Sequence, residues 1–549
     1  MFENNASGYD VIVYGTGIGG ATCALTLAQQ GARTLLMEKN EWTGGYAHGS
    51  GSHGFYWDHG GHIVLAYRLG MPTRQIFERL GIPERIDMIP DRQDFRCVFP
   101  GEGLELPADV TVAAEQLGRR FPAERDNIAT IFQTMQQVID DFVRLVPSFR
   151  APRRPDERRP LDTVLEQFQR PWLGDAIAPL AGILHFPGHT LLRYQNRTLQ
   201  QLLDEHLTDP LAKAYLSQMC VGVGTPPDEF SVLMASLFMI HAMQTMWLPR
   251  GGFGALIDTM LQMFKEAGGQ LVTGAEVARV CLTDGRATGV QTVDGRRFEA
   301  RAVVCASDAR RLFDRQLPAH VVPRRMRRRL ATSPTTPSFF QVQLGVDLDL
   351  NRYRDTLKRL NFIYPSFDVN TGCRNFAAGK VEEAAYYLYV ATFHQPEMAP
   401  AGMHSIKLEC PTNLVSKGVD WERDKEAIAD IFVRRSEALI PDLRKHIVVR
   451  RVFTPLDMAG TTRNADGAFA GWAFVPEMLS RRRPAQRTPV PGLYLAGQWT
   501  RPAAGLPGTS VSGYNTAGMV LADVLGRKDW LAPGPSAIGD GLSPDRIRR

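Results

Sequence analysis

The stretch from residue 9 to residue 38, YDVIVYGTGIGGATCALTLAQQGARTLLME, decides the fold of this chain. An apolar strand leads into a glycine-rich turn, the turn opens a helix, and a second apolar strand ends at Glu38. Gly15 permits the tight turn, Gly17 lets the backbone approach a pyrophosphate, and Gly20 lets the helix pack closely on the sheet. The pattern therefore predicts a parallel βαβ unit with an anion site at the start of its helix.

An acid and a second glycine pair extend this prediction. Glu38 follows Gly20 by 18 positions, where an acceptor for the ribose hydroxyls of an adenine dinucleotide belongs. The free N–H groups and the positive dipole end of the helix favour the pyrophosphate. Gly44-Gly45, followed by Tyr46, lets further backbone N–H groups face a second part of the same ligand. Together these features predict a dinucleotide site rather than a purely structural turn.

Length and composition indicate a globular protein of several domains. The chain has 549 residues, of which 44% are apolar and 22% charged, and its net charge of +5 indicates no nucleic-acid partner. Arginine clusters at Arg150–Arg159, Arg324–Arg329 and Arg481–Arg483. We interpret these clusters as solvated loops and a basic helix face, with contact to acidic lipid headgroups or an acidic partner as the alternative.

The cysteines and the N-terminus indicate a cytoplasmic location. Seven cysteines are scattered without a CxxC pair, which predicts small buried thiols in a reducing compartment. The N-terminus shows no secretion signal. The apolar stretch Phe230–Leu248 contains several polar residues and lacks a basic flank, so it predicts a buried or partly amphipathic helix rather than a membrane span. Peripheral contact with a bilayer stays open, because it needs only an apolar face.

Signals of the nucleotide-binding unit return twice later in the chain. Helical runs with proline-rich loops fill 69–245, and alternating strands mark 311–470. We therefore predict an α/β fold in which a Rossmann-like domain is assembled from discontinuous segments, beside an α+β substrate domain with a mixed sheet and a helical insert. The predicted segments are a nucleotide domain of 1–68, 246–310 and 471–527, a helical insert of 69–245 that is a substrate or membrane-facing domain, a substrate-binding sheet domain of 311–470, and a tail of 528–549.

With these motifs in hand, the chain resembles the phytoene desaturase and carotenoid isomerase family, FAD enzymes of the amine-oxidase-like flavoprotein group. The matching pieces occur in family order over nearly the whole chain. They are Gly15–Gly20, Glu38-Lys39, Gly44-Gly45, Leu248–Gly254, Gly274–Val277, Gly289-Val290, Ala399–Ser405, Thr454-Pro455, Leu493–Thr500, Gly505–Gly508 and Ser512-Gly513.

The resemblance implies a noncovalent FAD in a Rossmann-like domain of the amine-oxidase type. The backbone of Val277 would meet the adenine, Gly497 would approach the ribityl phosphate, and a helix starting near Thr509 would point at the flavin N1/C2=O edge. The cofactor-binding residues predicted in this way are Gly15, Thr16, Gly17, Ile18, Gly19, Gly20, Glu38, Lys39, Gly44, Gly45, Tyr46, Val277, Gly497, Gln498, Gly508, Thr509 and Ser510.

Two positions depart from the family pattern. Tyr46 stands where many relatives carry an arginine, and Gln498-Trp499 is more similar to the isomerase and saturase branch than to the desaturases. The resemblance thus implies hydride transfer at flavin N5 on a long apolar polyene or isoprenoid, in a desaturation, isomerisation or saturation. The alternatives are a redox cyclase of polyene-tetramate biosynthesis, with NAD(P)H as a transient donor, and an amine oxidase.

The substrate and the catalytic residues are less well determined by the sequence. An aromatic-rich second domain, including Phe339-Phe340, Tyr386–Tyr389 and Phe469, suits an apolar substrate, although ordinary sheet core is the plainer interpretation. Histidine is the side chain that titrates near neutral pH, and His59 and His62 are candidates for proton transfer or for cofactor contact. Their spacing fits no metal motif. The oligomeric state is not determined.

Overall fold

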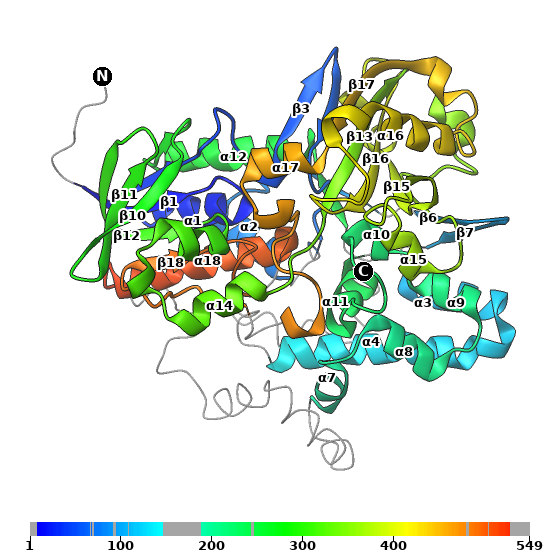
Figure 1. Ribbon diagram of the computed structural model, residues 1–549, viewed down its shortest axis with the longest axis horizontal. Coiled ribbons are helices and arrows are strands. Elements are labelled where there is room, and N and C mark those ends of the chain that lie inside the picture. The colour runs from blue at the N-terminus through cyan, green and yellow to red at the C-terminus, as the bar shows by residue number, and fades with distance from the viewer. Residues whose placement is uncertain are drawn as a thin grey trace.

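The computed structural model describes residues 8–65, 67, 71–91, 95–107, 109–145, 188–242, 246–478, 483–502 and 504–527. Within these residues the chain forms two seven-stranded sheets and two short two-stranded ones. Figure 1 shows the first large sheet and its helices as one lobe, the second large sheet as another, and a group of helices below the second. The predicted combination of an α/β domain with a mixed-sheet domain is confirmed.

The first sheet is built from the beginning, the middle and the end of the chain. Its strand order is β10-β11-β12-β1-β2-β9, with β18 beside β12. β1 lies between β2 and β12 and is parallel to both. The strand bounds are β1 Tyr9–Tyr14, β2 Thr34–Met37, β9 Gln270–Val272, β10 Val277–Thr283, β11 Arg286–Thr292, β12 Arg297–Cys305 and β18 Leu493–Leu495.

Close approach of two helices to the glycine turn explains several of the glycines. A Cβ on Gly19 would lie 2.5 Å from the Cα of Gly497, and a Cβ on Gly513 would lie 2.2 Å from the carbonyl oxygen of Gly19. A Cβ on Gly20 would lie 1.9 Å from the oxygen of Gly15. These glycines thus let α1 approach α18 and its own turn. The helices with buried side chains in this core are α1 Ile18–Gln29, α2 Pro72–Leu80, α12 Gly252–Glu266 and α18 Gly505–Asp523.

The second sheet has the order β17-β13-β16-β15-β14-β6-β7, and it is antiparallel except where β14 pairs with β6. β13 and β16 are buried along their whole length, as central strands with both faces covered should be. The strand bounds are β6 Phe95–Phe99, β7 Glu102–Leu106, β13 Ser338–Val346, β14 Leu360–Ile363, β15 Tyr386–Val390, β16 His404–Thr412 and β17 Ile447–Phe453.

Helices cover both faces of the second sheet. α16 (Trp421–Ser436) packs on one face, where Phe432 contacts Phe340 and Tyr386. The opposite face packs against helices of the predicted insert. The prediction that the insert is helical is only partly correct, because the insert also contains β6 and β7, which belong to the second sheet. α2 also falls within the predicted 69–245 but packs in the core of the first sheet instead. The other insert helices in the described residues are α3 Val110–Arg120, α4 Arg125–Leu145, α7 His189–Tyr194, α8 Leu199–His206, α9 Pro210–Leu216, α10 Cys220–Val223 and α11 Val232–Ser236.

The apolar stretch Phe230–Leu248 is not one helix, and that prediction is wrong. α11 continues into a π-helical segment, Leu237–Ala242, and the chain then enters β8 (Trp247–Pro249), which pairs with β5 (Met88–Pro90). Strand pairing at β8 and burial of the α11 side chains in the core explain the apolar composition. Across the described ranges, no helix combines the length and the apolar character that a membrane crossing requires.

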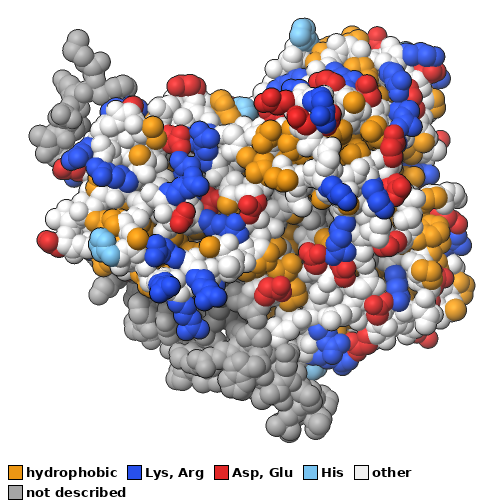
Figure 2. Space-filling model, viewed as in Figure 1, with side chains coloured by type: hydrophobic (Ala, Val, Ile, Leu, Met, Phe, Trp, Pro, Cys, Tyr) orange, Lys and Arg blue, Asp and Glu red, His pale blue; other side chains and the backbone are white. Residues whose placement is uncertain are grey.

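The arginine clusters have different environments. α14 (Arg324–Thr332) exposes four of its arginines, and Figure 2 shows basic side chains gathered where α14 lies in Figure 1. Arg483 contradicts the expectation of a solvated loop, because it is 1% exposed and donates to the backbone oxygens of Met478, Trp472 and Gln498. Arg150–Arg159 and the predicted tail 528–549 lie outside the described residues.

The prediction of buried thiols is confirmed for five cysteines but not for Cys281 and Cys373, which are partly exposed. All seven cysteines are free, and five of them are buried.

The remaining short strands and α-helices within the described residues are β3 Gly49–Ser52, β4 Phe55–Asp58, α13 Ala309–Arg311, α15 Val369–Arg374 and α17 Pro455–Thr462.

Candidate functional site

A cavity of about 400 Å³ runs from the glycine turn of the first sheet to a wall on the second sheet. It collects predicted site residues from four separate parts of the chain. The predicted cofactor-binding residues all line it, except Gly20, Gly508 and Ser510. His59 and His62 line it as well.

Thr16 joins the two glycine loops and is itself held by Glu38. The backbone nitrogen and Oγ1 of Thr16 donate to Glu38 Oε2 at 3.1 and 2.6 Å, and the backbone nitrogen of Gly44 donates to Thr16 Oγ1 at 2.9 Å. Glu38 Oε1 accepts from the backbone nitrogen of Asn40 at 3.1 Å. The carboxylate is 6% exposed and lines the cavity, so it organises the turn and still faces the space that a ribose would take.

The start of α1 has the features of a phosphate cradle. Gly17 is the N-cap and supplies no side-chain cap, so the first N–H groups of the helix are left to a ligand. A Cβ on Gly17 would find only the oxygen of Gly44 within 4 Å, at 3.8 Å, so the space in front of this backbone is open. The donors, the open space and the adjoining carboxylate fit a dinucleotide pyrophosphate and ribose.

The end of the chain contributes a second uncapped helix. α18 begins at Gly505, four residues before the predicted start at Thr509, and its N-cap Ala504 has no side-chain cap. Gly508 and Ser510 therefore lie inside the first turns of the helix, and Ser510 Oγ donates to the oxygen of Pro507. Gly505 and Thr509 line the cavity in their place. Sequence reasoning misplaced this start because proline at position 507 is compatible with a first helical turn.

The backbone oxygen of Val277, which also lines the cavity, already has a hydrogen-bond partner within the protein. It accepts a hydrogen bond of 2.8 Å from Gln316 Nε2. Arg311 pairs with Glu276 at 2.5 Å. Gln316, Arg311 and Glu276 all line the cavity and were not predicted, since nothing in their sequence spacing marks them. Lys39 also lines it, and burial lowers the pKa of its ammonium group.

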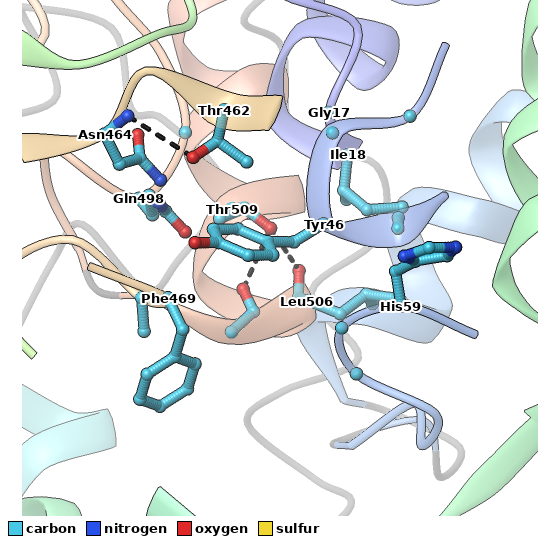
Figure 3. A pocket seen from close by; sticks show the side chains of 18 of the residues that line it. Gly17, Ile18, Tyr46, His59, Thr462, Asn464, Phe469, Gln498, Leu506 and Thr509 are labelled. Atoms are coloured by element: carbon cyan, nitrogen blue, oxygen red, sulfur yellow. Dashed lines mark hydrogen bonds between the residues drawn. The ribbon is translucent and has the colours of Figure 1, made fainter. Parts of the chain in front are cut away.

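Tyr46 occupies the middle of the cavity. Figure 3 shows its ring between Gln498 on one side and His59 on the other, in front of Thr509. The hydroxyl donates to the oxygen of Gly467 at 3.2 Å, and burial raises the pKa of Tyr46 to about 12, so the ring is a neutral phenol at physiological pH. A Cβ on Gly60 would lie 2.3 Å from the oxygen of Tyr46, so glycine is required there.

Beyond Tyr46 the cavity becomes apolar. Phe339 and Phe469 meet edge to face with their ring centroids 4.7 Å apart. Of the aromatic residues predicted to face a substrate, Phe339, Tyr387 and Phe469 line the cavity, whereas Phe340 packs under α16 on the other side of the sheet. The apolar residues of this wall include Met219, Phe238, Phe339, Phe362, Phe469 and Phe474.

The family comparison agrees with this geometry. The sequence profile described as "Flavin containing amine oxidoreductase" matches residues 18–521. The chain belongs to this family. It is therefore a flavin-dependent oxidoreductase, and the family indicates FAD as the cofactor.

Relatives of known activity align over most of the chain. The lycopene-forming phytoene desaturase of Pantoea ananas is 26% identical over 532 residues, which cover 93% of this chain and 99% of the relative. The zeta-carotene-forming phytoene desaturase of Myxococcus xanthus is 25% identical, with 92% and 93% covered. Prolycopene isomerase of Arabidopsis thaliana is 22% identical, with 95% and 84% covered. The predicted family resemblance is confirmed.

Solved structures confirm the fold. An oxidoreductase from Methanosarcina mazei superposes with a TM-score of 0.61 at 14% identity, covering 92% of this chain and 98% of its own. A putrescine oxidase bound to putrescine superposes with a TM-score of 0.60 at 15% identity, covering 94% and 99%. At these identities the likeness extends to the fold of the flavoprotein and not to its substrate.

The two predicted histidines are neutral in this flavoprotein. Burial, together with the nearby His48, Arg451 and Lys407, lowers the pKa of His59 to about 3. Its Nε2 lies 2.7 Å from Ser50 Oγ. Burial, with Lys407 and Arg359, also holds the pKa of His62 well below its ordinary value. Neither imidazole is a cation at neutral pH. In the described residues no cluster of His, Cys, Asp or Glu is arranged to hold a metal ion.

The largest omission of the sequence prediction is a buried polar cluster on the second sheet. Glu409 Oε2 accepts from Tyr387 Oη at 2.5 Å and lies 3.1 Å from Lys407 Nζ, while Oε1 accepts from Gln341 Nε2 at 2.5 Å. Glu409, Tyr387 and Gln341 line the cavity. A signal was present, because Lys407 and Glu409 stand two apart in an apolar strand and so share a face of the sheet.

Proposed function

We propose that this protein is an FAD-dependent oxidoreductase that acts on carbon–carbon bonds of a long apolar polyene or isoprenoid. The observation that carries the proposal is the continuity of one cavity from the phosphate cradle at Gly17 to the aromatic wall at Phe339 and Phe469. An elongated apolar substrate can lie against this wall while its reacting carbons reach the flavin. The phytoene desaturases and prolycopene isomerases that align over most of the chain support the same substrate class.

The chain's own residues divide the work along the cavity. Gly17 and the uncapped start of α1 would hold the pyrophosphate, Glu38 the ribose, and the uncapped start of α18 the electron-rich edge of the flavin ring. FAD supplies hydride acceptance or donation at its N5. Tyr46, Phe339 and Phe469 would exclude water and orient the hydrocarbon beside it.

We propose the class of the reaction but not its direction. Desaturation, isomerisation and saturation use the same cavity. A redox cyclisation of a polyene-tetramate intermediate, driven by NAD(P)H, is the second candidate, and it is favoured specifically by the polar cluster around Glu409, which an unfunctionalised hydrocarbon would not engage. Membrane contact through the exposed arginines of α14 stays an expectation from sequence.

The decisive experiment is anaerobic incubation of the purified yellow protein with candidate substrates while the flavin spectrum is followed. Bleaching of the flavin absorbance by a polyene alone supports desaturation. Bleaching only by NADPH, followed by reoxidation with a polyene or a polyene-bearing lactam, supports saturation or cyclisation. Bleaching by amines but not by polyenes or by NADPH would overturn the proposal.

A further inference from the structure

Two polar atoms in the cavity wall have no hydrogen-bond partner. They are Oε1 of Gln341 and Nδ1 of His62. Gln341 is 2% exposed and His62 is 7% exposed, and both residues line the cavity. A buried polar atom without a partner destabilises a folded protein, and where such an atom lines a cavity a ligand can complete it.

The orientation of the Gln341 amide is determined by its neighbours. Its Nε2 donates to the oxygen of His59 at 2.6 Å and to Glu409 Oε1 at 2.5 Å, so both amide hydrogens are used. Oε1 is therefore a free acceptor, and it needs a donor from the ligand.

The His62 ring is held in a similar way. It stacks on Tyr389 with ring centroids 3.9 Å apart, and its Nδ1 lies 4.0 Å from Glu409 Oε2, which is too far for a hydrogen bond. The ring is neutral because it is buried and because Lys407 and Arg359 lie nearby. A neutral imidazole offers one donor and one acceptor nitrogen, so Nδ1 can pair with an oxygen function of either kind.

Glu409 itself is not the group that seeks a ligand. Its two oxygens already accept from Gln341 and Tyr387 and face the ammonium group of Lys407. Its Oε1 lies 2.5 Å from Gln341 Nε2 and its Oε2 lies 4.0 Å from His62 Nδ1, so one carboxylate brings both residues to the same part of the wall. The carboxylate thus fixes a polar patch, made of Gln341 Oε1 and His62 Nδ1, in an otherwise apolar wall.

We propose that this patch binds a hydroxyl or enol group of the substrate, so that the molecule turned over is an oxygenated polyene rather than a plain hydrocarbon. An O–H group donates to Gln341 Oε1 and pairs with His62 Nδ1 at the same time. A carbonyl can satisfy only the histidine, and a methyl group satisfies neither. The inference rests on the proposed function for its choice of a polyene.

The test compares three all-trans polyenes of equal length that differ at one end, in a methyl, an aldehyde or a hydroxyl group. Dissociation constants are measured for the flavin-loaded protein by quenching of flavin fluorescence, in one detergent throughout. We expect the hydroxyl compound to bind about ten-fold more tightly than the methyl compound, with the aldehyde between them.

Two variants and a control locate this preference. H62F keeps an aromatic ring to stack on Tyr389 but removes the nitrogen, and Q341M removes the acceptor. Each should lower the hydroxyl-to-methyl ratio, and the two substitutions together should bring it close to one. Q343L should keep the preference of the wild type. Gln343 lies two residues further along the same strand, is fully buried and does not line the cavity, and its amide atoms also lack partners.

Several results would overturn the inference. Equal binding of the three polyenes by the wild type would do so, as would a preference that is unchanged in both variants. Loss of flavin from H62F and Q341M, but not from Q343L, would assign the patch to the cofactor instead. Flavin bleaching is recorded in parallel: if the hydroxyl preference is found and neither a polyene nor NADPH bleaches the flavin, the proposed function fails while the polar patch stands.

Discussion

The ammonium group of Lys407 lies 3.1 Å from Oε2 of Glu409, and each of these side chains is 2% exposed. Lys407 Nζ also donates to the backbone oxygens of Asp58 and Gly60, at 3.0 Å each. One buried cation thus joins a central strand of the second sheet to the loop that passes the flavin cavity.

Replacing Lys407 alone should destabilise the folded protein much more than replacing both Lys407 and Glu409. K407M leaves the Glu409 carboxylate buried without its cation, which costs about 3–5 kcal/mol in comparable cases. K407M combined with E409Q should recover a large part of that loss, because the amide carries no charge. Urea unfolding followed by circular dichroism measures both variants. An unfolding midpoint of K407M equal to that of the wild type would contradict the prediction.

Two glycines of the turn should separate cofactor binding from folding. A Cβ on Gly17 enters open space in the cavity, so G17A should fold normally and bind FAD about ten-fold more weakly. A Cβ on Gly20 would lie 1.9 Å from the oxygen of Gly15, so G20A should lower the melting temperature of the flavin-free protein itself. Flavin titration and thermal unfolding of the apoprotein measure the two effects. If G17A destabilised the apoprotein as much as G20A, the cradle assignment would be wrong.

His59 should make the stability of the folded protein decrease more steeply as the pH falls. Because its pKa in the folded state is about 3 and its ordinary value is 6.5, the unfolded chain binds more protons between these values. The stability that neutral His59 allows is therefore complete above about pH 6.5 and is lost as the pH falls toward 3. H59Q keeps a polar group near Ser50 but cannot titrate.

The check on His59 is the melting temperature of the wild type and of H59Q between pH 7.5 and pH 4, in one buffer system. The wild type should lose more stability on acidification than the variant does. Parallel curves would show that His59 titrates normally in the folded protein.

Asp58 should have the opposite effect, so that its contribution to the stability of the folded protein decreases as the pH rises. Burial raises its pKa from 3.8 to about 7, although Lys407 and the N–H groups of Phe253 and Gly254 lower it in part. The folded state then binds more protons than the unfolded chain between about pH 4 and pH 7, so the contribution is present at the lower pH and lost as the pH rises. Asp58 Oδ1 also accepts from the Phe253 nitrogen at 2.8 Å, at the start of α12.

In D58N the hydrogen bond to Phe253 can persist while the titration is removed. The stability of the wild type relative to D58N, measured by urea unfolding at a series of pH values, should therefore fall between about pH 4 and pH 7. A constant difference across that range would mean that the Asp58 carboxyl keeps its ordinary pKa. A difference that grew with pH would mean that its pKa is depressed.

Much of the cofactor end was predictable because its signals are local. The turn from Gly15 to Gly20, the acid at Glu38 and the pair Gly44-Gly45 each depend on backbone conformation or short spacing, which the chain alone determines. The start of α18 was misplaced because several residues there can open a helix. The secondary structure of Phe230–Leu248 was predicted wrongly because burial on all sides produces the same apolar run in a helix, a π-helical segment or a strand.

The sequence by itself determined the βαβ unit and the flavoprotein family, since the glycines of the turn are required by local sterics and the family motifs are short stretches of sequence. Only the tertiary structure decided which side chains of the second sheet line the cavity. Gln341, Tyr387 and Glu409 lie on three different strands, β13, β15 and β16, and their contact depends on the register of the second sheet. A side chain in a buried strand can face the core or a cavity, and pairing across the sheet makes that choice.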